Sequence, residues 1–226
     1  MTEKGFSDIR EKQSPIKQDD IYRVSDSKSP PWDINNKETP GDIKISLGKG
    51  MESVDKAELQ EAIQTAKESI AFIIEHAATD VEVKTAQVLL DMAKEGKVFI
   101  AVTGRPIYGY FQYGYDPKTG KEVRSIVLDY DALLAYGKAE TIDTLTHEGY
   151  HAAQHEEGHR NDCVEEETRA WNIGLGMSNQ YREEVGEYIA QTKPFTQRDI
   201  ENKGYTRDLG VGVFTELTGK NTGGMA

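Results

Sequence analysis

The chain has little of what marks exported, disulfide-bonded or membrane proteins. Cys163 is the single cysteine in 226 residues, so an internal disulfide is excluded and the fold must rest on its core or on a bound metal. No apolar run approaches the roughly 18 residues that span a bilayer. The N-terminus lacks the basic and then apolar regions of a secretory signal. We therefore expect a soluble protein, whose location the sequence leaves open.

The chain also lacks an excess of positive charge. Its formal net charge is −12, and the first fifty residues carry nine basic and nine acidic side chains, so the whole acidic excess falls on residues 51–226. An acidic surface repels phosphate backbones and gains nothing from anionic lipid headgroups. We therefore expect neither nucleic acid nor a membrane as a partner.

The first fifty residues show neither helical nor strand periodicity. They hold four of the seven prolines and are rich in Ser, Lys and Asp, a composition typical of a linker or a disordered tail. Residues 219–226 have the character of a second frayed end. The sequence therefore predicts one folded domain over 51–218, preceded by a disordered segment over 1–50 and followed by a short tail.

Hydrophobic periodicity predicts the elements of this domain. Apolar residues spaced by three and four predict helices over 54–74, 81–92, 132–136, 140–157 and 163–185. Runs of β-favouring residues predict strands over 98–102, 107–115 and 123–130, the last two as an antiparallel hairpin. Helices, a small mostly antiparallel sheet and further helices, in that order, indicate an α+β domain.

The helix predicted over 140–157 carries His147, Glu148 and His151 in the arrangement H-E-x-x-H. Residues four apart stack on one helical face, so two imidazoles can reach one ion, and the Glu can hydrogen-bond a water in the ion's open position. A helical wheel places both histidines nearly opposite an apolar face formed by Ile142, Leu145, Gly149 and Ala152. The helix can therefore pack on the sheet with one face and line a metal-binding cleft with the other.

A catalytic zinc takes three protein ligands and leaves one position for water, so a third ligand is required. On the helix over 163–185, Glu167 lies near the centre of the apolar face, Glu166 near its edge, and Glu165 points away. A carboxylate on an apolar face is costly unless a cation compensates it, which favours Glu167 and leaves Glu166 open. Small residues at Ala170 and Gly174 would let the two helices approach closely.

Other ligands compete with this assignment. His155 and His159 continue the histidine stripe at spacing four, which suggests a metal-storage protein, but the helical rise puts His155 about 12 Å from His147 along the axis. Asp162 is a further candidate for the third ligand. Cys163 can be either a fourth, thiolate ligand that silences the site or a buried thiol on the apolar face, and its position favours the thiol.

H-E-x-x-H followed about fifteen residues later by E-x-x-A on another helix resembles the gluzincin metallopeptidases. The segments HEGYHAAQ and EEETRAW are also similar to metallopeptidase domains at the C-terminal ends of bacterial polymorphic toxins. The resemblance implies a zincin-like fold in which His147, His151 and Glu167 bind Zn²⁺ and Glu148 is the base. It also implies an open sheet edge that pairs with an extended peptide, for which we expect the strand over 123–130.

The chain departs from the resembled family at one position. Many gluzincins carry an Asp four residues after the ligand Glu to orient a histidine, and this chain has Trp171 there. The orienting group must come from elsewhere, and Asp143, one turn before His147, is a candidate.

The expected function is therefore that of a zinc-dependent metallopeptidase, an endopeptidase in which zinc acidifies a water and polarises the carbonyl while Glu148 moves the proton. The toxin resemblance implies an effector domain at the end of a larger bacterial protein, with an inhibitory or immunity protein as a partner beside the peptide or protein substrate. The alternative is a catalytically inactive zincin-like domain that binds or scaffolds partners. The candidates for stabilising the oxyanion are Tyr108, Tyr110, Tyr150, Tyr181 and Tyr205, among which the sequence does not choose.

Overall fold

The computed structural model describes residues 43–203, apart from 105–106, 116–118, 160–162 and 190. Within these residues five α-helices and a four-stranded sheet form an α+β fold, as the sequence predicts at that level. The α-helices are α1 (Lys56–His76), α2 (Asp80–Lys94), α3 (Tyr130–Glu156), α4 (Val164–Val185) and α5 (Gln197–Asn202), and η3 (Met51–Ser53) is a short 3-10 helix. The strands are β1 (Ile45–Leu47), β2 (Val98–Ala101), β3 (Gly109–Tyr115) and β4 (Glu122–Asp129).

The four long helices begin and end close to the predicted positions because the sequence caps them. The carboxylate of Asp55 accepts backbone N–H bonds at the start of α1, and Thr79 and Glu82 form a capping box at the start of α2. The two helical segments predicted after the last strand are joined in α3 across Gly137, whose φ of 74° interrupts the helix. The short helix α5 has no counterpart among the predicted elements.

The strand order is β1-β2-β4-β3, and the sheet is mixed, so the prediction of a mostly antiparallel sheet is wrong. The β1–β2 and β2–β4 pairs are parallel, and only the predicted hairpin, β3 with β4, is antiparallel. Parallel pairs arise here because α1 and α2 connect β1 to β2, and because β3 lies outside β4. As a consequence β4 is interior, so the edge expected at residues 123–130 is not there, and in the described residues β3 forms that edge of the sheet.

Strand β1 comes from the segment for which the sequence predicts a linker. Residues 45–47 pair with residues 98–100 of β2, and the preceding Ile43 is buried in the core. A strand of three residues is too short to show a period in the sequence. The folded part therefore begins before residue 51, whereas the predictions for residues 1–42 and 219–226 lie outside the described residues.

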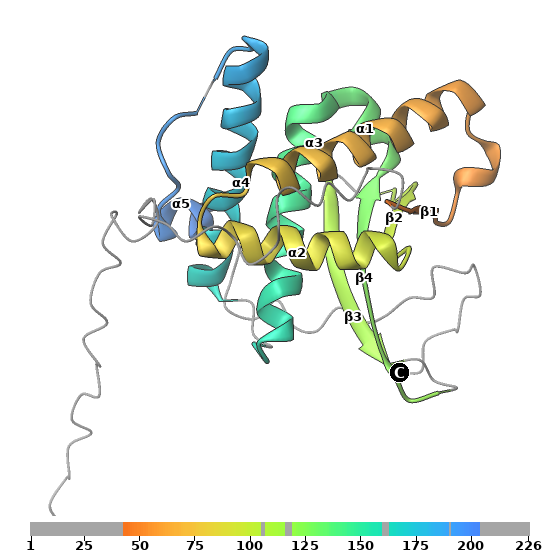
Figure 1. Cartoon of the computed structure of the whole chain (residues 1–226), viewed down its shortest axis with the longest axis horizontal. Coiled ribbons are helices and arrows are strands. Elements are labelled where there is room, and N and C mark those ends of the chain that lie inside the picture. The colour runs from red at the N-terminus through yellow and green to blue at the C-terminus, as the bar shows by residue number, and fades with distance from the viewer. Residues whose placement is uncertain (1–42, 105–106, 116–118, 160–162, 190, 204–226) are drawn as a thin grey trace, which may run out of the picture.

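Helix α3 is the central element of the fold. It packs against α1, α2, α4, β3 and β4, and Figure 1 shows it behind α1 and α2, which run across the molecule, with α4 at its side. Its predicted apolar face is confirmed, because Ile142, Leu145 and Ala152 are fully buried and Gly149 lies against Thr85 of α2. The face of α3 that carries His147 and His151 therefore packs against α4. None of the described helices combines the length and the apolarity that crossing a bilayer requires.

Helices α3 and α4 approach each other closely at Gly174, as the small residues on α4 predict. A Cβ on Gly174 would lie 2.8 Å from the backbone oxygen of Asp143, closer than side chains tolerate. Ala170, one turn earlier on α4, is fully buried. The close approach brings the first turn of α4 beside the histidines of α3.

Gly174→Ala should destabilise the metal-free protein by about 1–3 kcal/mol, because the added methyl overpacks the contact between α3 and α4. Urea unfolding measures this change. Gly176→Ala is the matched control, since no described atom lies within 4 Å of its added Cβ and helix propensity favours Ala there by about 0.5–1 kcal/mol. Equal effects of the two substitutions would contradict the proposed contact.

Candidate metal centre

Helices α3 and α4 bring the three predicted ligands together. The Nε2 atoms of His147 and His151 lie 3.2 Å apart, and Oε1 of Glu167 lies 3.1 Å from Nε2 of His151. Oε2 of Glu167 lies 3.6 Å from Nε2 of His147. Ligand atoms bound tetrahedrally at zinc distances would be separated by about 3.3 Å. The spacing therefore fits one ion of this size held between the two helices.

The burial of Glu167 adds an electrostatic argument for a cation. Its residue is 7% exposed, and its Oε2 atom is fully buried with no hydrogen-bond partner among the described residues. Burying an ionised carboxylate costs several kcal/mol unless an opposite charge compensates it. A divalent cation between Glu167 and the imidazoles would supply that charge.

The electrostatic state of His147 suits a metal ligand. The residue is 9% exposed. Burial, followed by the effect of His151, holds the pKa of His147 well below its usual range. Its imidazole is therefore neutral at pH 7, and one of its two ring nitrogens keeps a lone pair that can bind an ion.

Glu148 lies beside these ligands without joining them. Its Oε1 atom is 4.0 Å from Nε2 of His147, and its Oε2 atom accepts a hydrogen bond of 2.7 Å from the backbone N–H of Phe111 on β3. The group of ligands that can share one ion consists of His147, His151 and Glu167 in the part of the chain that the structure describes. Glu148 is therefore not part of the candidate ligand group, and its role as a base stays a prediction.

The neighbouring acids on α4 are directed elsewhere. Glu165 is paired with Arg169 at 2.8 Å on the exposed side of the helix, and Glu166 is 2.9 Å from Nδ1 of His159. The structure therefore favours Glu167 over Glu166, the alternative that the sequence leaves open.

The remaining histidines of the stripe do not converge on the same point. His155 is buried, pairs with Glu122 of β4 at 3.1 Å and packs against the ring of Tyr113. His159 pairs with Glu166. The described contacts thus give no support to a chain of metal sites, and Asp162 lies outside the described residues.

Cys163 and the tyrosines that were candidates for stabilising the oxyanion lie at different distances from the candidate ligands. Cys163 is the N-cap residue of α4, free and half-buried, rather than a fully buried thiol on the apolar face. Tyr150 is buried, which raises the pKa of its hydroxyl, and its ring lies 5.9 Å from that of His151. Tyr181, near the end of α4, instead packs against Phe72 of α1.

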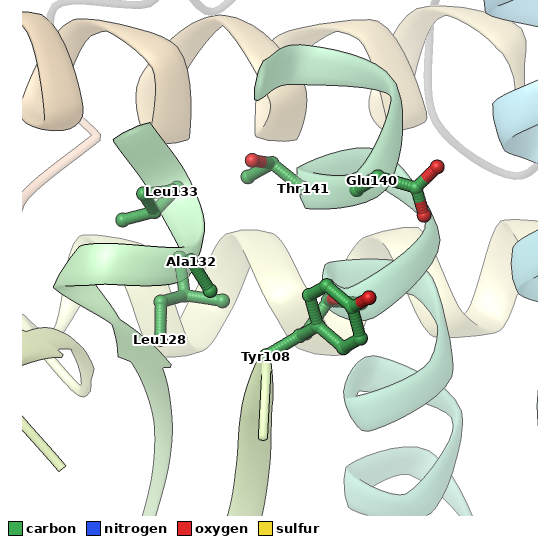
Figure 2. Close-up of a pocket in the computed structure, with 7 residues that line it drawn as sticks. Tyr108, Leu128, Ala132, Leu133, Glu140 and Thr141 are labelled. Carbon is green, nitrogen blue, oxygen red and sulfur yellow. The ribbon is translucent and has the colours of Figure 1, made fainter. Parts of the chain in front are cut away.

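Tyr108 belongs to a small pocket beside the kink of α3. Figure 2 shows its ring together with the carboxyl group of Glu140. The residues that line this pocket are Tyr108, Leu128, Ala132, Leu133, Glu140, Thr141 and Thr144, and they include none of the predicted ligands. Tyr110 lies on β3, one residue before Phe111, and Tyr205 lies outside the described residues. The choice of an oxyanion donor stays open.

Two further groups contact the candidate site: the ring of Trp171 and the backbone N–H of Phe111. Trp171 packs edge-on against His147 with ring centroids 5.4 Å apart, and Nζ of Lys203 lies 4.7 Å from the centroid of the Trp171 ring on α4. The contact of Trp171 with His147 could have been predicted from the sequence, because Trp171 follows Glu167 by four residues and residues so spaced share a helical face. The backbone N–H of Phe111 has no comparable signal in the sequence.

Asp143, the predicted orienting group, lies where α3 meets Gly174 of α4. Burial, and to a smaller extent the charge of Glu140, raises the pKa of Asp143 to about 7, although Arg182 and Lys203 act in the opposite direction. Its role in orienting a histidine stays a prediction.

Comparison of the chain with known protein families, with curated proteins and with solved structures finds no significant match.

Zinc should bind at one ion per chain. Glu167→Ala should lose this ion, because only two of the three protein ligands, the imidazoles of His147 and His151, remain. At a free zinc concentration a thousandfold above the dissociation constant, binding should stabilise the unaltered protein by about 4 kcal/mol. Metal analysis after dialysis and unfolding with and without zinc measure both effects. Glu165→Ala is the matched control on the same helix and should keep the ion; loss of zinc from both variants would contradict the assignment.

Asp143 should make the metal-free protein less stable as the pH rises from about 4 to about 7. In this range the folded protein keeps a proton that the unfolded chain has released, so the free energy of unfolding falls by at most about 4 kcal/mol through this residue. Asp143→Asn should remove this contribution, which urea unfolding at several pH values measures. The same pH dependence in both proteins would show that the carboxyl of Asp143 titrates normally.

Proposed function

We propose that the protein is a zinc-dependent metallopeptidase of gluzincin type, acting as an endopeptidase. The observation that carries this proposal is the meeting of two imidazoles and one buried carboxylate at separations that fit a tetrahedral ion, with a second carboxylate alongside. Three protein ligands leave one coordination position open, which distinguishes catalytic zinc sites from structural ones.

The residues of the site would divide the reaction between them. Zinc, when bound, acidifies a water and polarises the substrate carbonyl. His147, His151 and Glu167 hold the ion, and Glu148 takes a proton from the attacking water and delivers it to the leaving amine. Oε1 of Glu148 lies on the side of the ligands, at 4.0 Å from Nε2 of His147.

The position of β3 supports a peptide as the substrate and a zincin-like arrangement. β3 is an edge of the sheet in the described residues, and it lies along the face of α3 that carries Glu148. An open strand edge can pair with an extended peptide through backbone hydrogen bonds. A peptide bound there would pass close to the candidate metal centre.

Three other roles suggested by the sequence, those of a toxin domain, a metal-storage protein and an inactive scaffold, depend on different observations. A toxin or effector role, with an inhibitory protein as a partner, rests on the resemblance alone. A metal-storage role loses its main argument, because His155 and His159 are paired with Glu122 and Glu166. Zinc binding without any hydrolysis would indicate a catalytically inactive scaffold.

Glu148→Gln should keep stoichiometric zinc and lower hydrolysis of an unstructured protein such as casein by about 10²–10⁴-fold, because the amide cannot accept the proton. The rate of peptide release and the zinc content of the same sample measure the two effects. Glu156→Gln, at the exposed end of α3 and paired with Arg124, is the control and should stay active. Full activity of the Glu148→Gln variant would refute the role of the base.

A further inference from the structure

The two oxygens of the Glu148 carboxylate have different surroundings. Oε1 faces the candidate ligands, at 4.0 Å from Nε2 of His147. Oε2 accepts a hydrogen bond from the backbone N–H of Phe111 at 2.7 Å, a short distance for a bond from an amide. A carboxylate on a long side chain is thus held at one oxygen while the other is directed to the site.

The position of this N–H follows from the sheet. Phe111 is opposite Ile126 of β4, and its N–H is directed out of the open edge of β3 toward α3. The strand can come so near to the helix because Gly109 has no side chain: a Cβ there would lie 2.8 Å from Cγ2 of Thr144 on α3. Gly109 and Phe111 are two residues apart and therefore lie on the same face of β3.

We propose that the backbone N–H of Phe111 is a positioning group for Glu148, which fixes Oε2 so that Oε1 is presented to the reacting water. This inference rests on the proposed function and adds a second task to the edge strand. Whereas an edge strand can pair with a peptide through its amides, the Phe111 amide is committed to the base. Its removal should therefore affect the rate of the chemical step and not the binding of substrate.

The test compares two substitutions at one position in the zinc-loaded protein. Phe111→Pro removes the N–H, and proline is tolerated on the open side of an edge strand. Phe111→Ala removes the same ring and keeps the N–H. We expect kcat for casein-derived peptides to be about ten- to a hundredfold lower for the Pro variant than for the Ala variant, as for the loss of a hydrogen bond to a charged group. The two KM values should agree within about threefold.

The opposite pattern would overturn the inference. If Phe111→Pro raises KM and leaves kcat equal to that of Phe111→Ala, the amide serves the substrate and not the base. Tyr113→Pro, two residues further along the same edge, tests for general distortion of β3. A loss of kcat as large as that of Phe111→Pro would also count against a specific role of the Phe111 amide.

A measurement without turnover keeps the inference testable if the proline variant does not fold. The Phe111 amide should be protected from hydrogen exchange in the zinc-loaded protein, and Glu148→Ala should raise its exchange rate at least tenfold while the amide of the ladder residue Gln112 changes little. Equal exchange at Phe111 in both proteins would overturn the inference. Failure of the proposed function is distinguishable, because the unaltered protein would then bind zinc, protect the amide and cleave nothing.

Discussion

The burial of one carboxylate between two helices is the constraint on which the rest of the structure depends. Glu167 lies in the contact of α3 with α4, within 3.1–3.6 Å of the imidazole nitrogens of His151 and His147. Burial keeps the imidazole of His147 neutral, so this ring cannot cancel the charge of an ionised Glu167, and Oε2 of Glu167 has no hydrogen-bond partner among the described residues. The desolvation cost is several kcal/mol, which a divalent ion offsets most directly.

The surrounding fold serves this arrangement by giving α3 two different faces. Ile142, Leu145 and Ala152 bury one face against the other helices and the sheet, which fixes the histidines of the opposite face with little freedom. Gly174 lets α4 approach until its first turn reaches those histidines. Gly109 lets β3 approach on the third side, where its edge meets Glu148. The site therefore depends on small residues at each contact as much as on the ligands themselves.

Most of the site could be predicted from the sequence, because it lies on helices whose period shows which residues share a face. The H-E-x-x-H spacing singles out His147 and His151, and the apolar pattern of the next helix favours Glu167 while leaving Glu166 open. The sheet could not be predicted equally well: a strand's pattern shows that it is buried but not its neighbour, so β4 was expected at the edge and the sheet was expected to be mostly antiparallel. β1 was missed because it has three residues, and the Phe111 contact because a backbone N–H is common to almost every residue type.

The central claim is that a single zinc ion is held by two imidazoles and the carboxylate of Glu167. X-ray absorption of the zinc-loaded protein tests it most directly, because the method reports the element and its nearest atoms together. The account predicts one ion per chain with nitrogen and oxygen ligands at about 2.0–2.2 Å and no sulfur. A shell containing sulfur at about 2.3 Å, which would implicate Cys163, or a shell that is unchanged in the Glu167→Ala protein, would contradict it.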